Sequence, residues 1–364
     1  MDPNMTYLLT LIKLLVLKMP AWVSAVWYLG RRVKKDGLIL NAKIQLLCKF
    51  VDSARTIPID QLTPEQSRKQ LNHFARLFGA SKIPLNDIYD RTIPGPNHPI
   101  PVRVYCPSEQ STKASPALLY FHGGGWVQGN LETHDPICRR LAVYSGGIVI
   151  SVDYALAPEN KFPAAVNDSL AAFKWLRDHA EEFNADPARI AVGGDSSGGN
   201  LSAVLCQQIP QDNGPIFQLL FYPALDGRLS SRSHSLFKNG LFLTRERIDW
   251  FLKQYTEDFE AQRRDVRLSP SEQIDLSNQP PALIITAGFD PLRDEAYDYH
   301  LRLLASGVKS EYLQYSNMAH AFLNMAGIVH QGNDAMVYAS KALQMAWEKT
   351  NSTDNRAKHD VIKM

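Results

Sequence analysis

The chain has 364 residues, of which 45% are hydrophobic and 21% charged, an ordinary composition for one large globular domain or two smaller ones. Its 39 Lys and Arg residues nearly balance 37 Asp and Glu residues, for a formal net charge of +2. This balance excludes the strong basic excess that is typical of nucleic-acid-binding proteins. The four cysteines, at positions 48, 106, 138 and 206, form no C-x-x-C pair. We therefore favour buried free thiols over a disulfide, and a cytoplasmic location.

An apolar stretch occupies most of residues 1–40, which we interpret as an N-terminal extension. Lys13 and Lys18 interrupt it, and the longest run without a charge, 19–30, is shorter than the roughly 20 apolar residues that a membrane-spanning helix needs. A secretory signal peptide is also disfavoured, because the basic cluster at 31–35 follows the apolar part instead of preceding it.

Three interpretations of this extension stay open. We favour an amphipathic helix that packs over the protein's own active site. The second is peripheral contact of residues 5–35 with a membrane or lipid surface, because Trp22, Trp27 and Tyr28 adjoin the basic cluster as interfacial anchors do. The third is a true membrane span.

Helical and strand-like patterns alternate along the rest of the chain. Residues 41–80 have a helical pattern, in which Thr63 precedes Pro64 as a cap precedes a helix start. The stretch 87–106 is rich in proline and alternates between apolar and polar residues, which predicts short edge strands.

A regular order of strands and helices follows from residue 117 onward. Apolar strands are predicted at 117–121, 148–152, 190–192, 217–222, 282–286 and 311–315, and helices at 134–144, 163–183, 201–208, 293–306 and 334–349. This order predicts an α/β fold with a mostly parallel central sheet flanked by helices. The alternation breaks at 226–280, where polar residues and a helix at 244–255 predict an insertion that lies off the sheet. Residues 350–364 are polar, and we expect a flexible tail there.

The segment 194–198 has the pattern G-x-S-x-G, and it lies between a predicted strand and a predicted helix. A strand that turns sharply into a helix puts its apex residue in strained backbone, and the two glycines remove the clashes. Ser196 then projects its hydroxyl above the sheet, at a helix N-terminus that favours developing negative charge. Ser196 is therefore the candidate nucleophile, with a structural serine in a glycine-rich turn as the alternative. Ser197 fits less well, because no glycine lies two residues before it.

A serine nucleophile needs a base, and the base needs an acid that orients it. Asp290 and His320 each follow a predicted strand, at the carboxyl ends where open α/β sheets gather their chemistry. Their order after Ser196 is the order of an α/β-hydrolase triad. Asp294, one turn after Asp290, is the rival acid, which we expect to cap or pair locally. The other histidines late in the chain fit less well as the base. His300 lies in a predicted helix, His330 follows a helix-like run and His359 lies in the tail.

A glycine run at 123–125 directly follows strand 117–121. Bare glycines allow backbone N–H groups to approach a tetrahedral oxygen, and the N–H of Ser197 would complete such an oxyanion hole. A phosphate-binding loop is the alternative. It is disfavoured because no G-K-[ST] follows and no acidic residue stands where a ribose would need it.

Together these motifs resemble the hormone-sensitive-lipase branch of the α/β-hydrolases, which includes many bacterial carboxylesterases. The matching segments are H-G-G-G-W at 122–126, D-Y-A-L-A-P-E at 153–159, G-D-S-S-G-G-N at 194–200, D-P-L-R-D-E at 290–295 and H-A-F at 320–322. The resemblance implies a catalytic triad and an oxyanion hole, the triad being Ser196, Asp290 and His320. It implies that the hole is formed by Gly124, Gly125 and Ser197, with His122 and Gly123 as supports of the loop.

The resemblance also implies a helical cap, built here from 41–80 and 226–280, over a catalytic core of 81–225 and 281–349. Three residues depart from the family pattern. Ala155 stands where an arginine is usual, which affects a local salt bridge. Ala296 and Ala321 replace common glycines, and we expect them to tighten the loops after the acid and the histidine.

We therefore expect a serine carboxylesterase that hydrolyses short- to medium-chain acyl esters through an acyl-enzyme, with a small-molecule substrate and without metal or cofactor. A lipase that acts at a lipid surface is the alternative. A non-catalytic ligand receptor of the same fold is a third hypothesis, and amide hydrolysis or deacetylation also stays open. The sequence leaves a homodimer and peripheral membrane association open beside the cytoplasmic location.

Overall fold

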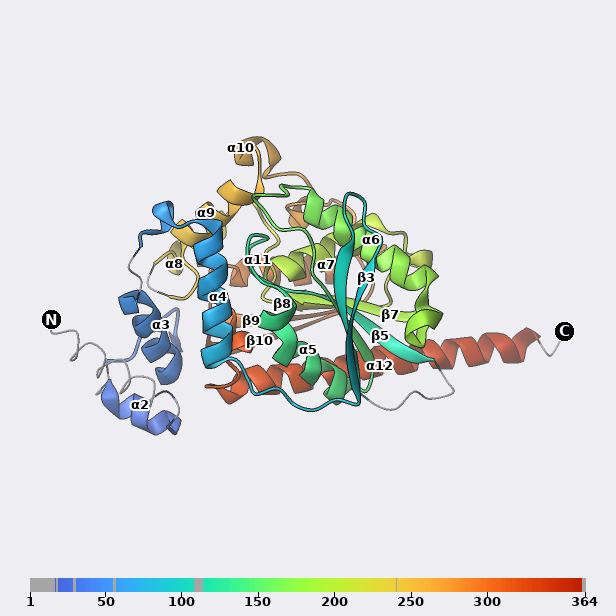
Figure 1. The fold of residues 1–364 in the computed structure, drawn as a ribbon, viewed down its shortest axis with the longest axis horizontal. Coiled ribbons are helices and arrows are strands. Elements are labelled where there is room, and N and C mark those ends of the chain that lie inside the picture. Colours follow the sequence, from blue (N-terminus) through green and yellow to red (C-terminus); the bar gives the residue numbers. More distant parts are fainter. Residues whose placement is uncertain are drawn as a thin grey trace.

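The computed structural model describes residues 17, 19–28, 31–54, 57–107, 114–239 and 241–361. Its centre is an eight-stranded sheet in the order β10-β9-β8-β7-β5-β6-β4-β3, with helices packed around it (Figure 1). The strands are β3 (Asp87–Ile93), β4 (Ile100–Cys106), β5 (Ser115–Phe121), β6 (Ile148–Val152), β7 (Ala185–Asp195), β8 (Gln218–Phe221), β9 (Ala282–Phe289) and β10 (Ser310–Ala319). Only the β3–β4 and β4–β6 pairs are antiparallel among these strands. The predicted α/β fold with a mostly parallel sheet is confirmed.

Alternate residues of each strand point to opposite faces of the sheet, and different helices cover the two faces. Leu118 and Tyr120 of β5 pack in one cluster with α5 and α12, whereas Leu119 and Phe121 pack in another with α6 and α7. Helix α11 packs against β8 and β9 in a third cluster, on the side opposite to α12. These helices are α5 (Leu131–Ser145), α6 (Ala164–Asp178), α7 (Ser197–Gln208), α11 (Arg293–Ala305) and α12 (His330–Val361).

Several element bounds differ from those predicted. The helix expected over 163–183 ends at Asp178, because His179 leaves the helical conformation, with φ −124°. The last helix continues past Lys349 to Val361, through residues assigned to a flexible tail. That stretch contains neither glycine nor proline, so no stop signal ends the helix. Strand β4 is paired on both sides, so β3 alone forms this edge of the sheet.

Two segments far apart in the sequence pack together at one end of the molecule, where Figure 1 shows α4, α8 and α9 near one another. The first holds α3 (Ala42–Ala54) and α4 (Pro64–Phe78), and the second α8 (Arg232–Leu236), α9 (Arg245–Tyr255) and α10 (Phe259–Gln262). Trp250 Nε1 donates a hydrogen bond to the Leu62 carbonyl oxygen at 3.1 Å, and the rings of Phe74 and Phe242 lie 4.9 Å apart. The predicted cap of α4 is confirmed, because the Thr63 side chain accepts from the N–H of Gln66.

The N-terminal extension is described in part, and the predictions for 1–16, 18 and 29–30 lie outside the described residues. Helix α2 (Ala21–Trp27) packs against α3, and the buried Leu17 and Tyr28 belong to the same apolar cluster as α3. A hairpin of β1 (Lys34–Lys35) and β2 (Leu38–Ile39) follows. Within the described ranges, no helix is long and apolar enough to cross a membrane. The four cysteines are free and buried, as predicted.

Candidate active site

Ser196 occupies a sharp turn between the end of β7 and the start of α7. Its backbone has φ 55° and ψ −115°, a strained conformation for a residue other than glycine. A Cβ atom at Gly198 would lie 1.9 Å from the carbonyl oxygen of Phe121, and one at Gly194 would lie 2.3 Å from the same oxygen. Only glycine fits at these two positions, which accounts for the G-x-S-x-G pattern.

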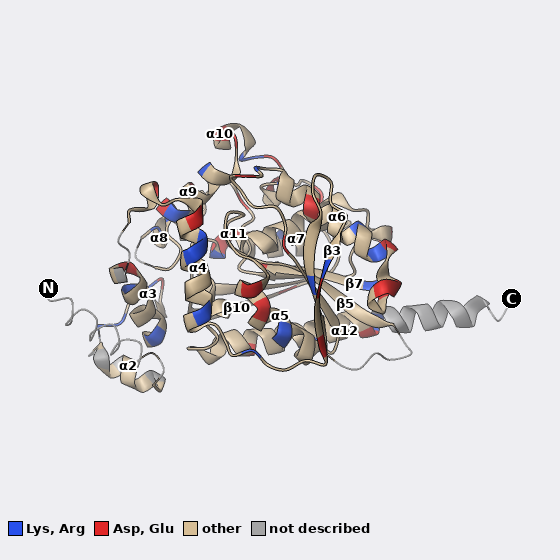
Figure 2. Cartoon of the chain, viewed as in Figure 1, with Lys and Arg blue, Asp and Glu red and all other residues tan. Residues whose placement is uncertain are grey.

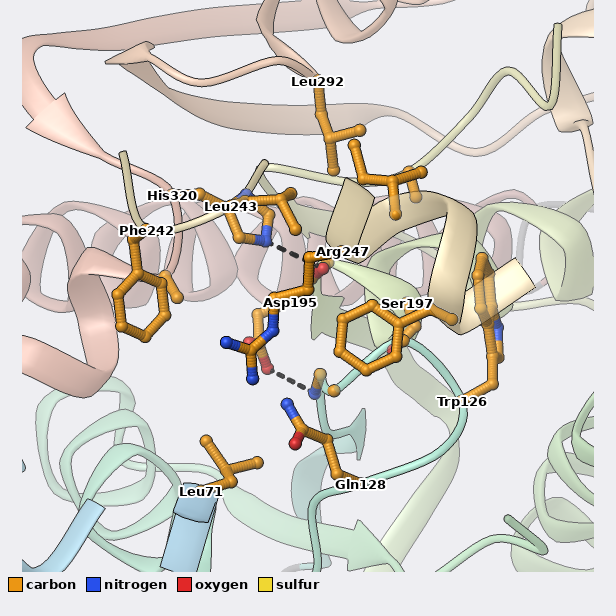
Figure 3. Close-up of a pocket in the computed structure, with 18 of the residues that line it drawn as sticks. Leu71, Trp126, Gln128, Asp195, Ser197, Phe242, Leu243, Arg247, Leu292 and His320 are labelled. Atoms are coloured by element: carbon orange, nitrogen blue, oxygen red, sulfur yellow. Dashed lines mark hydrogen bonds between the residues drawn. The ribbon is translucent and has the colours of Figure 1, made fainter. Parts of the chain in front are cut away.

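The structure brings the three predicted triad residues into one hydrogen-bonded chain. His320 Nε2 lies 2.9 Å from Ser196 Oγ, and His320 Nδ1 lies 2.7 Å from Asp290 Oδ2. Asp290 is completely buried after β9, and its second oxygen accepts the N–H of Leu292 at 2.9 Å. A carboxylate that accepts the Nδ1 proton leaves Nε2 as the hydrogen-bond acceptor for the serine hydroxyl. The edge of the Tyr222 ring packs against His320, whose place at the pocket wall is visible in Figure 3.

The rival candidates lie elsewhere or have other partners. His300 Nδ1 lies 2.8 Å from Ser310 Oγ, and the exposed His330 pairs with Asp334. Asp294 accepts hydrogen bonds from the Ser233 N–H and from Arg293, so it pairs locally as expected. His359 lies in the part of α12 whose side chains the structure does not describe.

The predicted oxyanion loop needs glycine for two physical reasons. Gly124 has φ +131° and Gly125 has φ +61°, backbone conformations that side chains disfavour. A Cβ atom at Gly124 would lie 2.0 Å from the Gln128 carbonyl oxygen, and one at Gly125 would lie 2.4 Å from the Phe251 ring. Gly124, Gly125 and Ser197 line the same pocket as Ser196.

His122 and Gly123 make contacts beneath this loop. His122 is completely buried, its Nδ1 lies 3.0 Å from the Gly123 carbonyl oxygen, and its ring stacks on Tyr154 with centroids 4.4 Å apart. The Tyr154 hydroxyl donates to the His122 carbonyl oxygen at 2.7 Å. Burial, with a smaller contribution from His134, lowers the pKa of His122 to about 3. The ring is therefore neutral near pH 7.

Sequence reasoning missed a buried network centred on Asp195. One carboxylate oxygen accepts the Gly123 N–H at 2.9 Å and the Tyr120 hydroxyl at 2.8 Å, and His134 Nε2 lies 3.3 Å from it. Burial alone would raise the pKa of Asp195, but His134 and these donors outweigh it and lower the pKa. The available signal was an aspartate inside the G-x-S-x-G segment, whose partners are distant in sequence.

A second buried pair, between His234 and Glu295, also escaped the sequence analysis. His234 Nε2 lies 2.7 Å from one Glu295 oxygen, and the other oxygen accepts the Leu225 N–H at 2.7 Å. Burial raises the pKa of Glu295, against the influence of His234. Burial opposes the charged form of His234, but the bond to Glu295 outweighs it and raises the pKa. This pair joins α8 to α11, the helix that begins three residues after Asp290.

The three departures from the family pattern have different outcomes. The Ala155 N–H donates to Asp168 Oδ2 at 2.8 Å, and His98 Nε2 lies 3.2 Å from that oxygen. Ala321 has φ +62°, the left-handed region in which glycine is favoured. Ala296 lies inside α11, so the expected tightening of a loop at this position is wrong.

The pocket above Ser196 is mainly apolar, and both segments of the predicted cap contribute to it (Figure 3). The apolar lining includes Val51, Leu71, Phe74, Phe242, Leu243, Ile248, Phe251, Leu252, Leu268 and Leu292. Arg247 also reaches the pocket, with its guanidinium 5.7 Å from the centre of the Phe251 ring. No described residue of α2 belongs to the lining, so the favoured prediction that this helix covers the active site is wrong for residues 19–28.

Comparison with known proteins identifies the class. The family of the alpha/beta hydrolase fold matches residues 118–324. The carboxylic ester hydrolase LipN of Mycobacterium tuberculosis is 42% identical over 308 residues, which cover 81% of this chain and 80% of that protein. An arylesterase of Saccharolobus solfataricus is 38% identical over 287 residues, which cover 78% of this chain and 92% of that protein.

Solved structures agree with this comparison. An ester hydrolase from the metagenome of Lake Arreo superposes with a TM-score of 0.80 at 40% identity, covering 84% of this chain and 98% of that one. A hyperthermophilic esterase of the archaeon Pyrobaculum calidifontis gives 0.79 at 36% identity, with 84% and 98% covered. The fold is that of an α/β-hydrolase. The chain belongs to the hormone-sensitive-lipase-like carboxylesterases of that family.

Proposed function

We propose that this protein is a serine carboxylesterase in which Ser196 is the nucleophile, His320 the general base and Asp290 the acid that orients His320. The proposal rests chiefly on the hydrogen-bond chain from Ser196 Oγ to His320 Nε2 at 2.9 Å and from His320 Nδ1 to Asp290 at 2.7 Å. Relatives named as ester hydrolases support the reaction class.

In the first half of the reaction, Ser196 Oγ attacks the ester carbonyl carbon while His320 Nε2 takes the hydroxyl proton. The Asp290 carboxylate is buried against Nδ1, where it stabilises the imidazolium that forms. His320 then gives this proton to the departing alcohol, which leaves the acyl group on Ser196. In the second half, water attacks the acyl-enzyme by the same route and releases the carboxylic acid.

The N–H groups of Gly124, Gly125 and Ser197 would donate to the oxyanion of the tetrahedral intermediate. Each such donor contributes on the order of 3 kcal/mol to transition-state stabilisation in serine hydrolases. Ser197 is the first residue of α7, where the helix dipole also favours negative charge.

The cap and pocket support short- to medium-chain acyl esters as substrates. We assign 41–80 and 226–280 to the cap over a core of 81–225 and 281–349. Aromatic side chains from both cap segments, Phe74 and Phe242, pack together at the pocket wall and limit its extent on that side. The remaining lining favours an apolar acyl or alcohol group.

A series of p-nitrophenyl esters from acetate to palmitate tests this proposal. We expect hydrolysis with a maximum kcat/KM at short or medium chain length. Ser196→Ala should lower kcat by about four orders of magnitude or more, because the variant has no nucleophile. Ser197→Ala is the matched control, since it keeps the backbone N–H and should retain most activity. Equal activity of wild type and Ser196→Ala would refute the proposal.

A further inference from the structure

Helix α2 has apolar side chains on a face that the rest of the described structure leaves exposed. Trp22 and Val26 are 68% and 60% exposed, and their spacing of four residues puts them on one side of α2. Met19, two residues before the helix, is 46% exposed. Ser24 and Tyr28 are buried on the side that packs toward α3. A short helix that buries one side and exposes large apolar groups on the other has an unpartnered surface.

Basic residues are concentrated in the part of the chain that contains α2 and α3. Residues 19–49 contain six Lys and Arg residues and one Asp, a formal charge of +5 in a chain whose total is +2. The rest of the chain therefore carries a net negative charge. Arg31, Lys34 and Lys49 are exposed, and the Lys49 ammonium lies 5.0 Å from the centre of the Tyr28 ring, at the end of α2. In Figure 2, α2 and α3 lie at one end of the molecule, on the opposite side from α6 and β7.

We propose that the exposed side of α2, with Met19 just before it and the exposed Arg31, Lys34 and Lys49 of the neighbouring segments, binds the surface of a bilayer that contains anionic phospholipid. Tryptophan favours the interface between headgroups and acyl chains, where an apolar ring and a polar N–H are both accommodated. Exposed lysine and arginine near it would pair with phosphate and carboxylate headgroups at an anionic surface. The excess of positive charge in the segments next to this apolar side argues for lipid over a second copy of this chain, since two copies would bring like charges together.

Helix α3 connects this surface with the pocket. Its inner residues pack against α2, and Val51 near its C-terminal end lines the pocket. Binding through α2 would therefore hold the cap segment at the membrane surface. The inference goes beyond the proposed esterase reaction and does not depend on it.

Sedimentation of the full-length protein with vesicles tests the inference directly. We expect binding to vesicles of phosphatidylcholine with phosphatidylglycerol, weak binding to phosphatidylcholine alone, and release at high salt because the attraction is screened. The double variant Trp22→Ser/Val26→Ser should bind at least about tenfold more weakly, and Lys34→Glu/Lys49→Glu should lose the preference for anionic vesicles.

Matched controls change similar side chains elsewhere. Ile274, which is 93% exposed, and Lys174, which is exposed on α6, lie outside this surface. Ile274→Ser and Lys174→Glu should leave vesicle binding unchanged. All variants should keep the rate of p-nitrophenyl butyrate hydrolysis in solution, which shows that they fold. Failure of the wild type to bind anionic vesicles, or binding that survives both double variants, would overturn the inference. A wild-type protein that forms dimers and does not bind vesicles, and whose dimers dissociate in Trp22→Ser/Val26→Ser, would also overturn the inference and would show self-association through this surface.

Discussion

The carboxylate of Asp195 accepts the backbone N–H of Gly123 at 2.9 Å, so the residue before Ser196 holds the loop of the proposed oxyanion hole. Tyr120 and His134 approach the same oxygen from β5 and α5. The Gly123 N–H is committed to this bond, which leaves the two following glycines to serve the substrate. Asp195 thus acts as a positioning residue through Gly123.

Replacement of Asp195 should therefore impair catalysis more than substrate binding. We expect Asp195→Ala to lower kcat by about one to two orders of magnitude with a small change in KM, because the donors no longer lie where the oxyanion forms. Asp195→Asn keeps an oxygen that can accept the Gly123 N–H and should retain more activity than the alanine variant. Steady-state kinetics with p-nitrophenyl butyrate measures both. A kcat in Asp195→Ala equal to that of the wild type would remove this role.

Gly125→Ala should damage the same site by a different mechanism. The added Cβ would lie 2.4 Å from the Phe251 ring, and the positive φ of residue 125 adds backbone strain of about 1 kcal/mol. We expect kcat/KM to fall at least about tenfold, which corresponds to about 1.4 kcal/mol. In a Phe251→Ala background the ring is absent, so adding Gly125→Ala should lower kcat/KM by a smaller factor than it does in the wild type. Equal losses in the two backgrounds would show that the clash with Phe251 is unimportant.

His122 should make the folded state less stable in mild acid. Its pKa is about 3 in the folded protein because of burial, against an ordinary value of 6.5. At a pH between these two pKa values, the unfolded chain binds a proton on His122 that the folded protein does not bind. The free energy of unfolding that is present above pH 6.5 is therefore lost as the pH falls toward 3. We expect the free energy of unfolding to fall between pH 7 and pH 5 by about 2 kcal/mol more in the wild type than in His122→Gln.

Urea unfolding at the two pH values measures this difference. The comparison with His122→Gln removes the contribution of the carboxylates, which both proteins share. The same pH dependence in both proteins would show that His122 is not held neutral by the fold.

The sequence was sufficient for features that depend on local pattern. The alternation of apolar strands with helices predicted the sheet. The position of 194–198 between a strand and a helix predicted the sharp turn at Ser196 that the structure shows. Asp290 and His320 could be chosen because each follows a strand, and parallel strands bring their carboxyl ends to one edge of the sheet.

Features that depend on long-range packing could not be predicted in this way. The partners of Asp195 come from β5 and α5, and no spacing in the sequence relates them. Phe251 and Arg247 reach the pocket from α9, whose placement depends on tertiary contacts such as the Trp250 bond to Leu62. A helix of the N-terminal extension was expected over the active site, but α2, its described helix, packs against α3, because hydrophobicity alone does not determine which surface a helix covers.

The most direct test of the central claim is to trap and locate the acyl group during turnover. Wild-type protein is mixed with p-nitrophenyl butyrate, quenched in acid within the first turnovers, digested and analysed by mass spectrometry. We predict a butyryl group on Ser196, and none on that peptide in the Ser196→Ala variant. A butyryl group on a different residue of the active wild-type enzyme, or undiminished turnover by Ser196→Ala, would contradict the assignment of Ser196 as the nucleophile.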